Sequence, residues 1–178
     1  MGDSIITIVA IFIVAILMLI YPLLAIAQNN ENVTQLAVQT VLSEFVNDVT
    51  TRGVIRQTDV DRLQQNLDAT GNTFDVEFEI ALLDENPGKK TVIVHTDAIG
   101  ENLRFSIFTT TIEEALARDG FYLLSMGDTV QVTVRNTNRT IAQLLRDFFY
   151  SAVGRSEYQI GASFSGMVVN SGRAPATN

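Results

Sequence analysis

The first feature of the hydrophobic pattern is a long apolar run near the N-terminus. Residues 4–30 contain no charged side chain. The central 23 residues, Ile5 to Ala27, are apolar apart from one threonine, one tyrosine and Pro22. As an α-helix these residues would span about 35 Å, slightly more than the roughly 30 Å hydrocarbon core of a bilayer. The run therefore predicts a transmembrane helix over about 5–27.

A cleaved signal peptide is the less favoured interpretation of the same run. Residues Ala25 to Gln28 read AIAQ, which has the small-residue spacing of a cleavage site. A signal peptide starts with basic residues and has an apolar core of about 7–15 residues, whereas this chain starts Met-Gly-Asp and stays apolar for longer. The first basic residue is Arg52, which lies too far from the run for positive charge to predict its orientation.

After Glu31 the apolar residues continue at the spacing of an amphipathic helix. One helical face carries apolar residues at intervals of four, three and four: Val38, Leu42, Phe45 and Val49. Such a face needs an apolar surface to cover, and the sheet of the following domain is the simplest one.

The two patterns join into one helix, predicted over 4–51 and roughly 70 Å long. Gly53 follows as a helix stop. Pro22 lies inside this helix and has no backbone N–H, so the carbonyl of Met18 loses its usual partner. We therefore expect the helix to loosen or bend near Pro22.

Beyond the long helix the pattern changes twice. Residues 58–70 form a predicted short helix with Thr58 as N-cap and Gly71 as its stop. The spacing then becomes two over 74–83, FDVEFEIALL, which predicts a strand with one buried face. The turn sequence DENPGKK and the apolar stretch TVIVHT at 91–96 predict that this strand continues into a hairpin.

The rest of the chain alternates between the two periods. It predicts a strand over 103–109, a helix over 111–119 closed by Gly120, a strand over 128–136, an amphipathic helix over 138–152 and an extended segment over 158–170. A capping box of Thr111 and Glu114 is expected to start the helix over 111–119.

These elements predict an α+β fold. A long N-terminal helix, transmembrane and then amphipathic, leads into a small, mostly antiparallel β-sheet head with two or three short helices. The expected division is 1–52 for the long helix, 53–172 for the α+β head domain and 173–178 for a loose C-terminal tail.

Charge and cysteine content narrow the classes of partner. The formal net charge is −8, and residues 1–51 contain four acidic residues but neither lysine nor arginine. Binding to nucleic acid or to an anionic membrane surface draws on clustered basic residues. Neither is therefore expected as the main partner. The absence of cysteine excludes disulfides and cysteine-ligated zinc.

Patterns for catalysis and metal binding are weak. The single histidine, His95, lies on a predicted strand, where a structural or exposed role is favoured. The carboxylates of Asp75, Glu77 and Glu79 share one strand face, but alternation gives the same arrangement on any solvated face, so calcium binding is the less favoured interpretation. The sequence predicts no enzyme, cofactor or metal site.

Two tripeptides match the N-glycosylation pattern, beginning at Asn32 and Asn138. Such tripeptides also occur by chance. Asn138 is explained equally well as the cap of the helix predicted to follow it.

Two long stretches carry a resemblance to a known family. LIYPLLAIAQ at 19–28, followed by VLSEFVNDVTTRGVIRQTDVDRLQQNLDATGNTFDVEFE at 41–79, resembles the single-pass pilin-like or TadE-like proteins of Gram-positive tight-adherence (Tad) pilus and related secretion loci. GDTVQVTVRNTNRTIAQLL and SGMVVNSG, within 127–172, are similar to the end of such proteins. The middle of the chain does not align.

The resemblance implies a non-enzymatic subunit or accessory protein of an extracellular filament or secretion apparatus, anchored in the cell membrane with its head outside. Its partners would be the membrane, further copies or other pilin-like subunits and, indirectly, a secretion ATPase and platform proteins. Assembly would use the apolar helix, including Ile5, Ile8, Phe12, Ala15, Leu19, Tyr21, Pro22 and Ile26.

The sequence departs from the pilin pattern in two places. No basic leader ending in glycine precedes the apolar run, and Ile5 and Ile6 stand where pilins usually keep a glutamate. The resemblance therefore does not extend to prepilin-peptidase processing or to standard pilin assembly. The alternative function is a single-pass, membrane-tethered ligand-binding or sensor module, in which the helix is a plain anchor.

Overall fold

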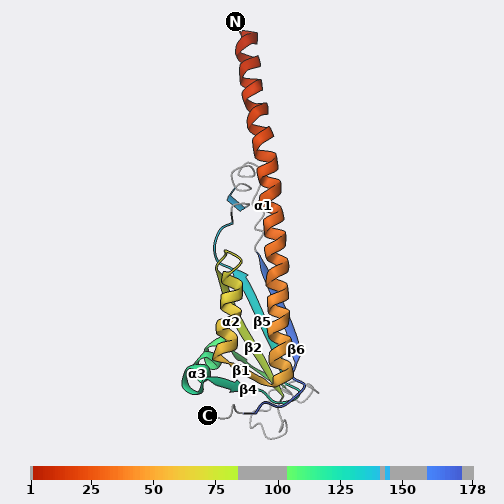
Figure 1. Cartoon of the computed structure of the whole chain (residues 1–178), viewed down its shortest axis with the longest axis vertical. Coiled ribbons are helices and arrows are strands. Elements are labelled where there is room, and N and C mark those ends of the chain that lie inside the picture. The colour runs from red at the N-terminus through yellow and green to blue at the C-terminus, as the bar shows by residue number, and fades with distance from the viewer. Residues whose placement is uncertain (1, 84–103, 141–142, 145–159, 174–178) are drawn as a thin grey trace, which may run out of the picture.

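The computed structural model of the chain describes residues 2–83, 104–140, 143–144 and 160–173. It confirms the predicted α+β fold: one long N-terminal helix is followed by a small antiparallel sheet and short helices (Figure 1).

Helix α1 (Gly2–Arg52) is continuous through both sequence patterns. Its N-terminal half projects away from the rest of the molecule, and its C-terminal half lies against the head (Figure 1). The buried side chains of that second half lie four, three, one and three residues apart, as the amphipathic pattern predicts: Val38, Leu42, Phe45, Val46 and Val49.

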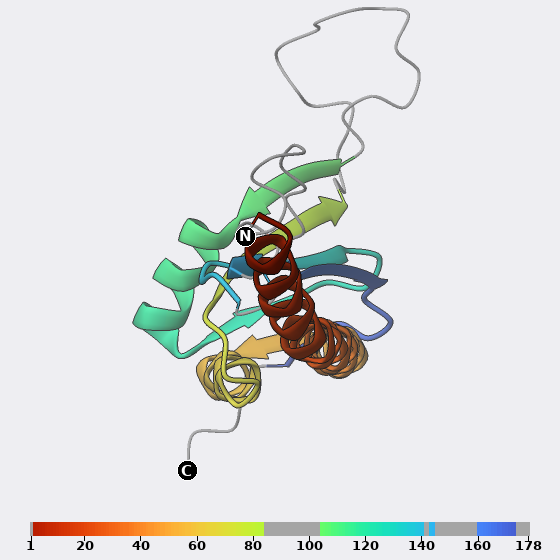
Figure 2. The same ribbon diagram turned by 90° about the horizontal axis from the view of Figure 1, so that it is seen from above.

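The main sheet has the strand order β3-β2-β5-β6, with every neighbouring pair antiparallel. Strand β2 (Phe74–Leu83) pairs with β3 (Arg104–Phe108) on one side and with β5 (Thr129–Asn136) on the other. Strand β6 (Gly161–Met167) forms the far edge beside β5. Figure 2 shows this order from above, with α1 beside β6.

The two central strands turn most of their apolar residues to the face that α1 covers. In the two central strands the buried residues alternate with exposed or half-buried ones along the chain: Phe74, Phe78, Ile80, Val130, Val132 and Val134. They form one core with the second half of α1 and with the other head helices. Full burial of each such side chain contributes about 1.5–3 kcal/mol, so α1 and the head fold as one unit.

Helix α2 (Gln57–Asp68) begins earlier than the sequence predicts, and Thr58 is not its cap. Arg56 occupies the N-cap position with an extended backbone, and its N–H donates to the Asp59 carboxylate at 3.2 Å. Arg56 also ends the short strand β1 (Val54–Arg56), which pairs with β4 (Phe121–Leu123). The start of α2 is thus set by strand pairing rather than by the best local cap residue.

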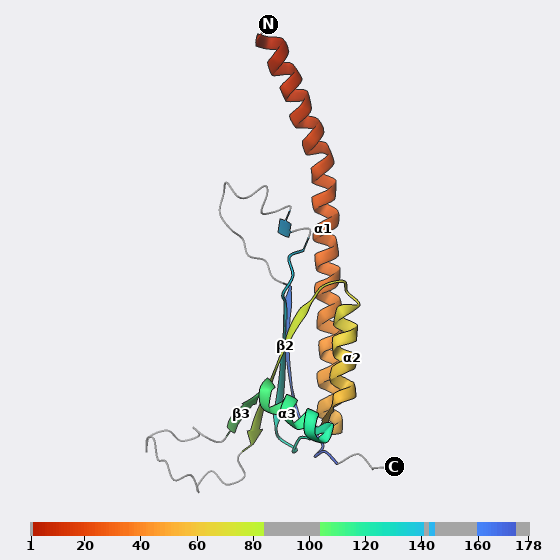
Figure 3. The same cartoon turned by 90° about the vertical axis from the view of Figure 1, so that its left-hand side faces the viewer.

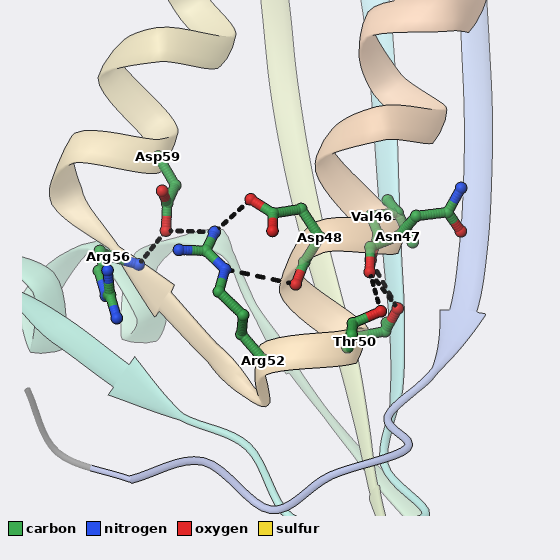
Figure 4. A network of polar contacts seen from close by, with 8 residues as sticks. Val46, Asn47, Asp48, Thr50, Arg52, Arg56 and Asp59 are labelled. Carbon is green, nitrogen blue, oxygen red and sulfur yellow. Dashed lines mark hydrogen bonds and ion pairs between the residues drawn. The ribbon is translucent and has the colours of Figure 1, made fainter.

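An ion-paired arginine joins the end of α1 to the start of α2. The Arg52 guanidinium lies between the carboxylates of Asp48, at 2.5 Å, and Asp59, at 3.1 Å (Figure 4). Because Asp59 also caps α2 and is almost buried, this contact fixes the angle between the two helices.

Helix α3 (Thr109–Asp119) also begins before its predicted capping box. Its N-cap is Phe108, so Thr111 and Glu114 lie within the helix and do not form the box. The hydroxyl of Thr109 instead accepts the N–H of Phe78 in β2, at 2.8 Å. At the other end Gly120 closes the helix in the left-handed conformation, which confirms the predicted stop.

The expected cap at Asn138 is replaced by Thr140. The Thr140 hydroxyl accepts the N–H of Gln143 at 3.2 Å, and the Gln143 amide oxygen accepts the N–H of Thr140 at 3.0 Å. This reciprocal pair is a capping box. Asn138 instead holds the turn before β2, because its Oδ1 accepts the N–H of Thr73 at 2.8 Å.

Several predictions fall wholly or largely on residues outside the described part of the chain. These are the turn over 84–90, the strand over 91–96 with its hairpin, most of the helix over 138–152 and the tail beyond 173.

The apolar part of α1 leans toward the side of the molecule that holds the sheet (Figure 3). The helix is unbroken across Pro22. By helical periodicity Pro22 shares a face with Thr40, five turns further on, and this face points away from the core. A proline ring crowds the carbonyl one turn earlier, so relief of that clash tilts the helix away from the proline face. The lean of the apolar part is in the direction that a proline bend would give, and a bend at Pro22 itself stays a prediction.

The C-terminal segment after β6 ties the end of α1 to the head. The N–H of Val169 donates to the carbonyl of Thr50, and the Asn170 side chain donates to the carbonyl of Thr51, at 3.0 and 2.9 Å. The turn at Gly53 has a positive φ of 67° and touches the backbone of this segment directly. The end of the first helix and the last described segment are thus held together by hydrogen bonds.

Candidate assembly surface on the first helix

The apolar half of α1, residues 4–27, lies almost entirely outside the core. Every side chain from Ser4 to Leu19 is exposed, and Phe12 retains 67% of its accessible surface. All the residues expected to serve assembly are exposed: Ile5, Ile8, Phe12, Ala15, Leu19, Tyr21, Pro22 and Ile26. The structure thus places them on one projecting helix.

This much apolar surface needs a non-aqueous environment. A helix of 23 residues and about 10 Å diameter presents roughly 1,000 Å², more than the largest apolar patch of about 300–600 Å² on a typical soluble monomer. Among the described residues, α1 is the one helix long and apolar enough to cross a membrane. By length and composition the segment is compatible with a single-pass anchor or with a signal sequence.

The exposed apolar surface extends beyond the membrane-length segment. Val33 and Leu36 keep 60% and 65% of their surface, and both lie on the side of α1 away from the core. We call these two residues the distal face. As a helix rises 1.5 Å per residue, they lie about 9 and 14 Å beyond Ala27, whereas the interfacial layer of a bilayer is only about 5–7 Å deep. Lipid tails therefore reach neither residue.

Two polar side chains hold α1 to the head where the apolar half ends. Glu31 is only 4% exposed, and the hydroxyl of Thr140 donates to its Oε1. One turn further, the Gln35 amide makes two hydrogen bonds with the backbone of Gly161: Nε2 donates to the carbonyl at 2.6 Å, and Oε1 accepts the N–H at 3.1 Å. These contacts set the direction in which the apolar half leaves the head.

Sequence reasoning missed this junction. Glu31 is the first charged residue after the apolar run, and Gln35 lies on the same helical face as Val38 and Leu42. Polar residues on a core-facing stripe are the signal that could have identified them. Their partners are more than 100 residues away in sequence, so the contact itself could not be inferred.

Replacing Gln35 by alanine is expected to destabilise the head by about 1–2 kcal/mol, because both backbone groups of Gly161 lose their partners in a partly buried place. Chemical unfolding of the full chain in detergent, followed by circular dichroism, measures this. Gln39→Ala is the matched control, since Gln39 is exposed and one turn further along, and it should change the stability by less than about 0.5 kcal/mol. Equal effects of the two substitutions would contradict the role of Gln35.

Two of the acidic residues on the outer face of the sheet, the face away from α1, contact neighbouring polar side chains. Glu77 lies 3.5 Å from Arg135, and Glu79 accepts a hydrogen bond from Ser106 at 2.7 Å. The described residues contain no group of three metal-ligating side chains, and His95 lies outside them. The acidic strand therefore has the environment of a solvated face.

A groove of about 240 Å³ lies between α1 and α2 and is lined by both apolar and charged side chains, among them Phe45, Asp48 and Arg62. It is smaller than the roughly 300–1,000 Å³ of typical ligand pockets.

Elsewhere in the head, the pKa of the Tyr122 phenol is raised, first by burial and then by the nearby Asp128 carboxylate. The phenol therefore stays protonated at neutral pH and is unsuited to act as a base.

The two glycosylation tripeptides differ in their surroundings. Asn32 is exposed on α1, close to the end of the apolar half. Asn138 is half-buried, and its Nδ2, the atom that a glycan would modify, donates to Asn72 at 3.2 Å. Only Asn32 is thus presented to an enzyme in the described fold.

Comparison of the chain with protein families, with curated proteins and with solved structures found no match in any of the three. The function is therefore argued from the geometry of α1 and of the head.

Proposed function

We propose that this protein is a non-enzymatic, membrane-anchored structural subunit of pilin-like plan. It assembles through the apolar half of α1 into an extracellular filament or secretion apparatus, with its head outside the cell. The resemblance of its sequence to TadE-like proteins of tight-adherence loci agrees with this plan.

The observation that carries the proposal is the distal face. Val33 and Leu36 are exposed apolar residues beyond the reach of lipid tails. A plain anchor has no need for them, whereas a helix that packs along a second α1 buries them together with the apolar half. Uncharged helix surfaces suit lipid and a dry helix bundle equally well, so exchange between the two environments costs little free energy.

The head supports the proposal by holding α1 in a fixed direction. The Glu31 and Gln35 contacts and the shared core join helix and sheet into one body. When helices of this kind gather, each head therefore takes a defined place. A regular assembly requires such a fixed relation between the packing helix and the rest of the subunit.

The proposal is tested by making the distal face polar. A V33S/L36S variant leaves residues 4–27 unchanged and is expected to enter the membrane normally, but to yield few or no filaments by electron microscopy of expressing cells. Q39S/T40S is the matched control, because both residues are exposed and polar on the same part of α1. Filaments at the normal level with V33S/L36S would overturn the proposal.

The alternative is a membrane-tethered ligand-binding or sensor module, and a helix swap separates it from the filament subunit. Replacing residues 4–27 by an unrelated uncharged membrane helix keeps the head and its anchor. A tethered binder would keep its activity, whereas a packing subunit loses assembly although it still reaches the membrane.

A further inference from the structure

Along the outer edge of β6, the backbone groups at both ends of the strand are hydrogen-bonded, whereas those between the ends have no partner within the described residues. The bonds from Asn136 N–H to the Ile160 carbonyl and from Val168 N–H to the Asp128 carbonyl show that even-numbered residues face β5. Because backbone groups alternate along an antiparallel strand, odd-numbered residues face outward. The outward-facing backbone groups of Gly161 are hydrogen-bonded to the Gln35 side chain, and the N–H of Val169 donates to the Thr50 carbonyl.

Between these ends the odd-numbered residues are Ser163, Ser165 and Met167, and all three are exposed. No hydrogen bond within the described part of the chain occupies their edge-facing N–H and C=O groups. Strand β6 contains no charge and no proline, although natural proteins use both to protect free edges. The edge is thus built in a form that accepts another strand.

Within the part of the chain that the structure describes, the opposite edge of the same sheet is also open. By the same alternation, the outward-facing backbone groups of β3 belong to Arg104, Ser106 and Phe108, each of which is exposed. Both edges therefore offer three outward-facing residues. They run in opposite directions, because β6 is parallel to β2, and β3 is antiparallel to β2.

We infer that β6 of one copy pairs with β3 of the next copy, so that the sheets of neighbouring heads join edge to edge. This rests on the proposed function, in which copies stand side by side with the same orientation. Strands β6 and β3 of two such copies are antiparallel, as a ladder between them requires. The partner is therefore a second copy of this chain.

The position of α1 favours this contact. Helix α1 covers one face of the sheet near β6, so helices gathered around a common axis leave the outer faces turned outward. The two edges of each sheet then point sideways toward its neighbours. Pairing β6 with β3 uses two different surfaces, which is the heterologous kind of contact that extends into rings or filaments.

Engineered cysteines test the pairing directly, because the chain has none of its own. Ser106 and Ser165 both lie on the outer face of the sheet. Oxidation of S106C/S163C and S106C/S165C variants of the full chain in cell membranes should give a ladder of cross-linked oligomers with at least one of the two pairs. A mixture of the S106C and S165C single variants should stop at dimers. S106C/Q131C is the control, since Gln131 is exposed on the central strand β5.

Two results would overturn the inference: no ladder above the control with either pair, or dimers from S165C alone, which would indicate pairing of β6 with β6. A Ser165→Pro variant removes an outward-facing N–H while it leaves the hydrogen bonds of the even-numbered residues to β5, and it should lower cross-linking and assembly about tenfold or more, with Ser165→Thr unaffected. If S165P assembles normally while V33S/L36S does not, the edge contact is wrong and the helix-packing function stands. If V33S/L36S assembles normally as well, the proposed function fails.

Discussion

A lysine in place of Phe12 is expected to abolish assembly. Phe12 is exposed in the middle of the charge-free segment, without any neighbouring acidic side chain to pair with an ammonium. A lysine near the centre of a membrane helix costs about 2.5–3.5 kcal/mol, which corresponds to a loss of roughly 100-fold in insertion. In a dry bundle of helices the same charge would be repeated in every subunit. Membrane fractionation measures insertion, and electron microscopy of the cell surface measures assembly.

The control for this substitution is Phe12→Leu, which keeps the position apolar and should retain both insertion and filaments. Normal filaments with the lysine variant would mean that the apolar half does not lie in an apolar environment after assembly. That result would remove the helix-packing function even if the membrane anchor itself were retained.

An alanine in place of Gly53 is expected to destabilise the head by about 3 kcal/mol. The positive φ of Gly53 costs an alanine about 1–2 kcal/mol. The added Cβ would also lie 2.0 Å from the Asn170 carbonyl oxygen and 2.5 Å from the Gly172 nitrogen, both backbone atoms. Overpacking of this kind typically adds about 1–3 kcal/mol. Chemical unfolding followed by circular dichroism provides the measurement.

Gly71→Ala separates the two contributions. Gly71 has a similar φ of 80°, but an added Cβ there meets nothing within 4 Å. This variant should therefore lose only the conformational part, about 1–2 kcal/mol. If both variants lose the same amount, the close approach of the C-terminal segment to Gly53 contributes nothing to stability.

The sequence predicts best those parts of the fold that depend on periodicity. The strand expected over 74–83 matches β2, and the strand expected over 128–136 differs from β5 by one residue. Alternation is strong in both because one face of the sheet is buried by helices and the other is solvated. Helix α1 could be predicted for the same reason, since its two halves each repeat one pattern over many turns.

Helix starts could not be predicted, because tertiary contacts decide them. Thr58 and Thr111 are good local caps, yet both helices start earlier. The pairing of Arg56 with Phe121 in β1 and β4 fixes the start of α2, and the pairing of Phe108 with Glu79 fixes that of α3. Both pairings join residues far apart in the chain.

The candidate assembly surface could be predicted in part from the sequence. The apolar half follows from the absence of charge over 4–30. The distal face does not, because Val33 and Leu36 lie on the opposite side of the helix from Val38, and only the structure shows which side the head covers. The open edges of the sheet also require the strand order, which the pattern of apolar residues does not contain.

The continuity of α1 has a mechanical consequence. Tension applied to the apolar half of α1 enters the head along the helix axis. Helix α1 lies along β6 and is fixed to it at two places about 15 residues apart, at Gln35 and at Thr50. A pull along the axis therefore loads these contacts and the packed side chains between them in shear, all at once, instead of opening them one after another. The head is arranged to carry force as a whole, with its first and last described segments sharing the load.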